Sequence, residues 1–114
     1  NISGWASFRG RPGYSAYDAA KAGIMRFTET VSQEWAPFGV RVNAVAPGSF
    51  PDPDQMSAEA YQTRQDDAKG RVPLGRIGQL KEPGYLCVFL ASPAASYITG
   101  QTWAVDGGIS IKHP

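Results

Sequence analysis

Tyr17 and Lys21 have the residue types and the spacing for proton transfer. They stand four residues apart in a stretch with helical periodicity, so both side chains are expected on one face, one turn apart. A phenol has a reference pKa of about 10, and a cation held beside it favours the phenolate and lowers that pKa. The pair is therefore suited to pass a proton to or from a carbonyl or alcohol oxygen near neutral pH. Taken alone, such a pair is far more often a solvated helix face with a packed tyrosine, so the rest of the chain has to decide.

The elements expected around this pair alternate between strands and helices. They are a strand end at 1–3, a helix at 14–36, a Val-rich strand at 40–46, a helix at 81–91 and a strand at 102–105. The polar stretch 49–70 follows a strand end, where α/β proteins keep lids, and a surface helix is expected at 57–69. This order predicts parallel α/β units.

Composition excludes several classes of function. The chain has 114 residues, 42% of them hydrophobic and 18% charged, with a net charge of +1, which predicts one small domain and no nucleic-acid partner. No apolar run reaches the length of a membrane span. Cys87 is the only cysteine, fits a reducing, cytoplasmic compartment, and is predicted to be a buried small hydrophobe. We assign no metal ligands.

Three motifs in order resemble the short-chain dehydrogenase/reductase family. They are Tyr17-x-x-x-Lys21, the segment 40–48 that ends in Pro-Gly, and 99–101 followed by Val-Asp-Gly-Gly at 105–108. The segments 74–76 and 89–92 add further agreement. The resemblance covers nearly the whole chain and corresponds to the C-terminal half of a compact, single-domain member.

The resemblance implies a fold and a chemistry. The fold is a Rossmann-like doubly wound parallel sheet, of which this chain supplies the last strands, and the cofactor is NAD or NADP. Tyr17 would be the acid/base, and Lys21 would bind the nicotinamide ribose and lower the Tyr17 pKa. Pro47, Gly48 and Phe50 would line the nicotinamide pocket, beyond a strand end where such folds bind ligands. The implied reaction interconverts a secondary alcohol and a ketone or 3-oxoacyl-type carbonyl.

One departure from the family pattern concerns the substrate oxygen. The family places a serine thirteen residues before the catalytic tyrosine, and here that position is Gly4. Ser3 is expected to point away, because side chains alternate along a strand, unless a bulge at Gly4 re-aims it. Ser7 in the following loop is an alternative donor. Ser3, Gly4 and Trp5 are the expected substrate contacts.

A second departure and one missing motif bear on the cofactor. Asp52 stands where the family usually has a threonine near the nicotinamide, and we carry over no role for it. No glycine-rich phosphate loop occurs in the chain. Residues 1–114 are therefore expected to be the C-terminal portion of one NAD(P)-binding domain whose phosphate-binding half is absent, and to be inactive alone.

Two functions remain open at this point. The first is an NAD(P)-dependent oxidoreductase acting on a small carbonyl or alcohol. The second is a non-catalytic oligomerising or ligand-binding relative that has lost the serine at Gly4. Retention of Tyr17 and Lys21 favours the enzyme. A homodimer or homotetramer is expected, with the stripe Phe27, Val31 and Trp35 serving either core or subunit interface.

Overall fold

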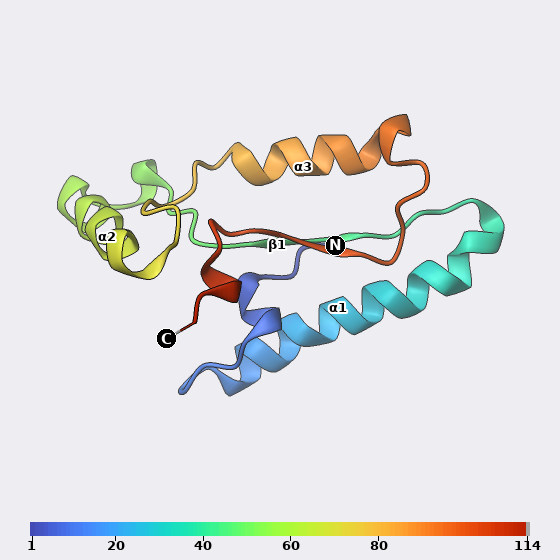
Figure 1. Ribbon diagram of the computed structural model, residues 1–114, viewed down its shortest axis with the longest axis horizontal. Coiled ribbons are helices and arrows are strands. Elements are labelled where there is room, and N and C mark those ends of the chain that lie inside the picture. Colours follow the sequence, from blue (N-terminus) through green and yellow to red (C-terminus); the bar gives the residue numbers. More distant parts are fainter. Residues whose placement is uncertain (114) are drawn as a thin grey trace.

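The computed structural model describes residues 1–113, and a small parallel sheet forms its centre (Figure 1). Strand β1 (Ala44–Pro47) pairs with β2 (Thr102–Val105) in parallel register, with Val45 opposite Trp103. A parallel bridge joins Ile2 to Val45, so the segments lie in the order Ile2, β1, β2. The sheet is therefore parallel, as the alternation of elements predicts.

Helices cover both faces of this sheet. Helix α1 (Ser15–Trp35) lies against one face and α3 (Glu82–Ala91) against the other, while α2 (Ala58–Arg71) lies beyond the carboxyl ends of the strands (Figure 1). Short 3-10 turns connect them: η1 (Trp5–Phe8), η2 (Ala36–Phe38), η3 (Pro53–Gln55), η4 (Pro93–Ala95) and η5 (Ile109–Ile111). The loops that follow β1 and β2 thus open toward α2.

Local signals explain where the helices begin and end. Pro37 lies in η2 directly after α1, and Gly39 adopts a left-handed φ of 74° that reverses the chain. Ser57 caps α2, because its hydroxyl accepts the backbone N–H of Ala60 at 3.1 Å. Pro83 lies in the first turn of α3, where its missing N–H costs nothing. Because these signals are local, the bounds expected from the sequence agree with the three helices to within two residues at each end.

The strand expected at 40–46 is shorter and later than predicted, because only Ala44–Pro47 form it. The preceding backbone is bound by loop groups instead of a neighbouring strand. The Val42 backbone N–H donates to the Thr99 hydroxyl at 3.0 Å. The side-chain amide of Asn43 donates to the Ile98 carbonyl at 2.9 Å. The strand expected at 1–3 is reduced to the single bridge at Ile2.

Two apolar clusters hold the elements together. Val45, Leu90 and Ala95 are buried between the sheet and α3. Ala68 and Val72, at the end of α2, pack with Ile77. Apolar surface removed from water stabilises by roughly 25 cal/mol per Å². The second cluster therefore anchors α2 to the connector that leads into α3.

Only part of the stripe Phe27, Val31 and Trp35 packs in the core of this chain. Val31 is buried, but Phe27 and Trp35 are about half exposed, at 57% and 48%. Thr28 is buried in their place, where its hydroxyl accepts from the Asn1 amide at 2.8 Å. Cys87 is exposed, which contradicts the prediction that it is buried, because its side of α3 borders a cavity that Asn1 and Val45 also line. No helix within residues 1–113 combines the length and apolarity needed to cross a membrane.

Candidate active site

The Tyr17 and Lys21 side chains lie together near the start of α1. The Lys21 ammonium is 5.7 Å from the centroid of the Tyr17 ring, so the two share a helix face, as their spacing predicts. The tyrosine is 51% exposed. The ammonium donates to the Ile2 carbonyl at 3.4 Å, a long bond that uses one of its three protons. Both groups are therefore available to a bound molecule.

Gly4 faces this pair directly. A side-chain carbon built at Gly4 would lie 3.7 Å from the Tyr17 hydroxyl and 3.9 Å from the Lys21 side chain, which is ordinary van der Waals contact. The backbone there is extended, a conformation that any residue adopts. A serine would fit at this position and would stand beside the phenol, so the geometry matches the place where the family carries its hydroxyl.

The two nearby serines are turned elsewhere. Ser3 is 2% exposed, and its hydroxyl contacts that of Ser7. Each hydroxyl also lies 3.0 Å from the Lys21 carbonyl oxygen, to which it can donate. These bonds tie the loop to the backbone of α1 and use the hydroxyl protons. We therefore propose no substrate contact for either serine.

A second cation, to which no sequence motif pointed, lies against Tyr17. The Arg11 guanidinium is 5.4 Å from the centroid of the Tyr17 ring, and 4.8 and 4.2 Å from those of Trp5 and Tyr14. It forms an ion pair of 2.6 Å with Asp18, which is 8% exposed. Arg11 is thus enclosed by three aromatic rings and one carboxylate.

Hydrogen bonding and charge fix this pair. The bond to Arg11, together with the Arg11 backbone N–H at 2.8 Å, lowers the pKa of Asp18. The same bond raises the pKa of Arg11. The sequence does show an acidic residue, Asp18, directly after Tyr17 in the first turn of the helix. No pattern in the sequence indicates that Arg11 is its partner.

The Pro47–Gly48 segment lies where β1 ends. The Gly48 N–H donates to the Val105 carbonyl at 2.9 Å, which continues the sheet into the loop. A side-chain carbon at Gly48 would lie 2.7 Å from the Cα of Asp106, closer than real atoms approach. Asp106 in turn accepts from the Gly108 and Ser110 N–H groups at 2.9 Å. Only glycine lets the loops after β1 and β2 come this close.

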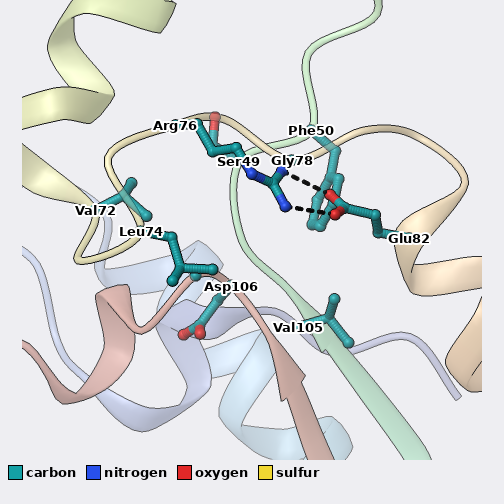
Figure 2. Close-up of a pocket in the computed structure, with 10 residues that line it drawn as sticks. Ser49, Phe50, Val72, Leu74, Arg76, Gly78, Glu82, Val105 and Asp106 are labelled. Atoms are coloured by element: carbon teal, nitrogen blue, oxygen red, sulfur yellow. Dashed lines mark hydrogen bonds and ion pairs between the residues drawn. The ribbon is translucent and has the colours of Figure 1, made fainter.

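Phe50 lies beside a narrow cavity of about 100 Å³ at these strand ends (Figure 2). Its ring packs on Gly78, where a side-chain carbon would lie 2.1 Å from it. Arg76 and Glu82 line the same cavity and form an ion pair of 2.6 Å, drawn with dashed lines in Figure 2. Asp52 has a structural role, because its carboxylate accepts the Asp54 N–H at 3.0 Å and begins η3.

A second, larger cavity joins the two parts of the site. It measures about 330 Å³ and is lined by Trp5 and Arg11 on one side, by Gly48 at the end of β1, and by Arg64 and Arg71 of α2. Arg11 is the residue that connects this cavity to the Tyr17 ring. The structure thus brings Trp5 and Gly48 to one space, with Tyr17 stacked behind Arg11.

The C-terminal tail fastens α2 over this region. The Lys112 ammonium contacts the Gly70 carbonyl near the end of α2. Arg9 donates to the Lys112 carbonyl at 2.9 Å. The tail therefore joins the end of α2 to the segment that follows η1, beside the cavity of about 330 Å³ that α2 lines.

The residues present fit the nicotinamide-ribose half of a dinucleotide. The Lys21 ammonium keeps protons for ribose hydroxyls, Tyr17 is exposed, and Gly48 brings the backbone to a cavity at the carboxyl end of the sheet. No glycine-rich loop that would cradle the diphosphate occurs among the 114 residues.

Comparison with known proteins identifies the family of the chain. A family model described as Enoyl-(Acyl carrier protein) reductase matches residues 1–110. The 3-oxoacyl-acyl-carrier-protein reductase of Thermotoga maritima is 40% identical over 111 residues, which are 97% of this chain and 44% of the relative. The chain thus spans less than half the length of this relative.

Solved structures extend the likeness to the fold. The acetoin dehydrogenase of Enterobacter cloacae superposes with a TM-score of 0.86 at 33% identity, covering 100% of this chain and 43% of its own. A short-chain oxidoreductase of Pseudomonas aeruginosa PAO1, described as NADPH-bound with an atypical catalytic center, gives 0.86 at 31% identity, covering 98% and 45%.

The fold is the one that these Rossmann-type oxidoreductases share. The chain belongs to the short-chain dehydrogenase/reductase family, a family of enzymes whose reductases use NAD or NADP.

Proposed function

We propose that the protein carrying this chain is an NAD(P)-dependent oxidoreductase that interconverts a secondary alcohol and a ketone or 3-oxoacyl-type carbonyl. One observation carries the proposal: the exposed Tyr17 ring lies 5.7 Å from the Lys21 ammonium on a helix that contacts β1. Residues 1–114 would be the C-terminal portion of one NAD(P)-binding domain, with the diphosphate-binding part supplied by a preceding segment. We expect the protein to work in the cytoplasm as a homodimer or homotetramer on a small molecule, without nucleic acid or membrane.

The side chains divide the work. Tyr17 donates its phenolic proton to the substrate oxygen during reduction and takes it back during oxidation. The Lys21 ammonium places a positive charge beside the phenol and donates to the cofactor ribose. Pro47, Gly48 and Phe50 hold the nicotinamide, which supplies or accepts the hydride when bound. Gly4 and Trp5 face the substrate.

The pair Tyr17→Phe and Tyr14→Phe tests this assignment in the full-length protein. Both rings stack with Arg11 and both are about half exposed, so the two variants lose the same atom in similar surroundings. General acid catalysis is worth about 10²–10⁴ in rate. Tyr17→Phe should lower kcat by that amount while Tyr14→Phe stays within a few fold. Equal effects of both variants would exclude Tyr17 as the acid/base.

The absence of a serine at Gly4 supports one alternative, a relative that binds a nicotinamide cofactor without turning substrate over. A panel of ketones followed by nicotinamide absorbance, together with cofactor binding by fluorescence, separates the two. Binding with no oxidation or reduction of any member of the panel would favour the alternative.

A further inference from the structure

The cavity of about 330 Å³, which Arg11 connects to the Tyr17 ring, has cations along one wall. Arg64 and Arg71 line it from α2, seven residues apart and therefore on one face of the helix. Asp67, between them on the same face, lines it as well. Of the four ion pairs found among residues 1–113, none includes any of these three residues. The α2 side of the cavity therefore carries two guanidiniums against one carboxylate.

A neighbouring cavity continues the positive wall. It measures about 460 Å³, shares Trp5, Arg11 and Arg71 with the first, and adds Arg9 and Lys112. No acidic side chain within residues 1–113 lines it. Arg71 stands where the two cavities meet. A charged group that entered from either side would meet Arg71.

Helix stabilisation accounts for only part of this arrangement. Arg71 and Lys69 lie in the last turn of α2, where a cation is favoured by the helix dipole. Arg64 lies in the middle of the helix, where that effect is small. Lys69 is also engaged differently, since it forms an ion pair of 2.8 Å with Asp66. Arg11, which also lines the cavity, is paired with Asp18, so Arg64 and Arg71 are the arginines of this cavity that are left for a ligand.

We propose that the substrate carries an oxyanion, a carboxylate or a phosphate, which Arg64 and Arg71 bind while the reacting carbonyl or alcohol faces Tyr17. Guanidinium groups present paired N–H donors that match the oxygens of either group. The aromatic ring of Trp5, which lines both cavities, would pack on the carbon chain between the two ends. This inference rests on the proposed oxidoreductase function and deepens it by naming the substrate class.

Matched substrates test the inference in the full-length protein. A 3-oxo acid is compared with its methyl ester, and a phosphorylated ketone with its unphosphorylated parent. Each anionic member should have a kcat/KM at least tenfold above its neutral partner. The larger of the two preferences tells carboxylate from phosphate. Equal values, or a preference for the neutral members of both pairs, would overturn the inference and leave the oxidoreductase function standing.

Variants on α2 locate the effect. Arg71→Gln should reduce the preference for the anion by about 10- to 100-fold, since hydrogen bonds to charged groups are the strong ones. Lys69→Gln is the matched control. Lys69 lies in the same turn of α2 as Arg71, but its side chain does not line the cavity. An equal loss in both variants would point to general electrostatics rather than to a site.

A binding measurement decides the matter if no compound is turned over. Inorganic phosphate is titrated into the full-length protein by calorimetry, with and without the Arg64→Gln and Arg71→Gln substitutions combined. Phosphate binding that weakens at least tenfold in the double variant would support the anion site even though the proposed function had failed. Binding that is absent, or the same in both proteins, would refute the site.

Discussion

Arg11 and Asp18 form an ion pair of 2.6 Å that stands directly behind the Tyr17 ring. Two guanidinium nitrogens and the Arg11 backbone N–H all donate to the one carboxylate. The pair connects the loop after η1 to the first turn of α1. It thereby fixes the ring that we propose as the acid/base against the wall of the cavity.

Asp18→Asn should therefore impair catalysis through position. The amide keeps the shape but loses the charge that orders Arg11, and a misplaced catalytic group costs up to about 10²-fold in rate. We expect kcat to fall by about ten- to a hundredfold while cofactor affinity changes little, measured by steady-state kinetics and fluorescence titration. Asp66→Asn is the control, because Asp66 pairs with Lys69 on the exposed surface of α2. Similar losses in both variants would contradict the positioning role.

Gly4→Ser should increase turnover. The added carbon meets only ordinary contacts beside Tyr17, so the hydroxyl can be accommodated without strain. One positioned donor to a developing oxyanion is worth about 10²–10³ in rate. We expect kcat to rise at least tenfold. Gly4→Ala adds the same carbon without the hydroxyl and should give no increase. A rise in the alanine variant, or none in the serine variant, would show that the missing hydroxyl does not limit the reaction.

Gly48→Ala should destabilise the fold. The new methyl group would stand 2.7 Å from the Cα of Asp106, so the ends of β1 and β2 would have to separate. Overpacking of this kind costs about 1–3 kcal/mol. The free energy of unfolding in urea should fall by that amount. Gly10→Ala provides the comparison, since a carbon there meets nothing within 4 Å. A neutral result at Gly48 would mean that the two loops yield easily.

Acid should weaken the closure of the narrow cavity. The bonds from Arg76 and from the Gln79 N–H lower the pKa of Glu82 to about 2. Because the folded pKa lies below the unfolded value of about 4.3, the carboxylate stabilises the folded state above that value and the stabilisation is lost toward pH 2. Unfolding measured from pH 5 to pH 2 should show a smaller decrease in Glu82→Gln than in the parent.

Glu34→Gln serves as the reference for the acid experiment. Glu34 takes part in none of the four ion pairs within residues 1–113. Its variant should follow the parent across the pH range. A Glu82→Gln curve that overlays both would mean that the bonds to Glu82 contribute nothing to stability.

The sequence predicts the elements of this fold better than their hydrogen bonding. Hydrophobic periodicity and the flanking proline and glycine residues are enough to predict α1 and α3, because both signals are local. The strand predicted at 40–46 is too long because Val40 and its neighbours favour extended backbone, whereas strand pairing depends on which partner lies alongside. There the partners are loop groups, Thr99 for Val42 and the Ile98 carbonyl for Asn43.

The candidate site divides in the same way. The fixed spacing of Tyr17 and Lys21 puts them on one face, so the sequence alone brings them together. Arg64 and Arg71 of α2 reach the site through tertiary packing with a segment more than fifty residues away, that of Arg11, which no local pattern reports. Arg11 lies only six residues from Tyr17, but the loop that folds it back onto the ring has no periodicity from which the contact could be predicted. Burial of Ser3 follows likewise from its bonds to the α1 backbone.

Because Lys112 contacts Gly70 near the end of α2, a fluorescent label on the C-terminal tail would report on the position of α2. A dye attached at His113 would lie one residue from Lys112, whose ammonium contacts the Gly70 carbonyl. Its emission would report whether the tail stays in contact with α2, and stopped flow would time any separation of the two. Because Cys87 is exposed, a thiol-directed dye would also label α3 unless that cysteine were first replaced. An affinity tag fused beside His113 would lie next to the contact between Lys112 and Gly70, which favours tagging elsewhere.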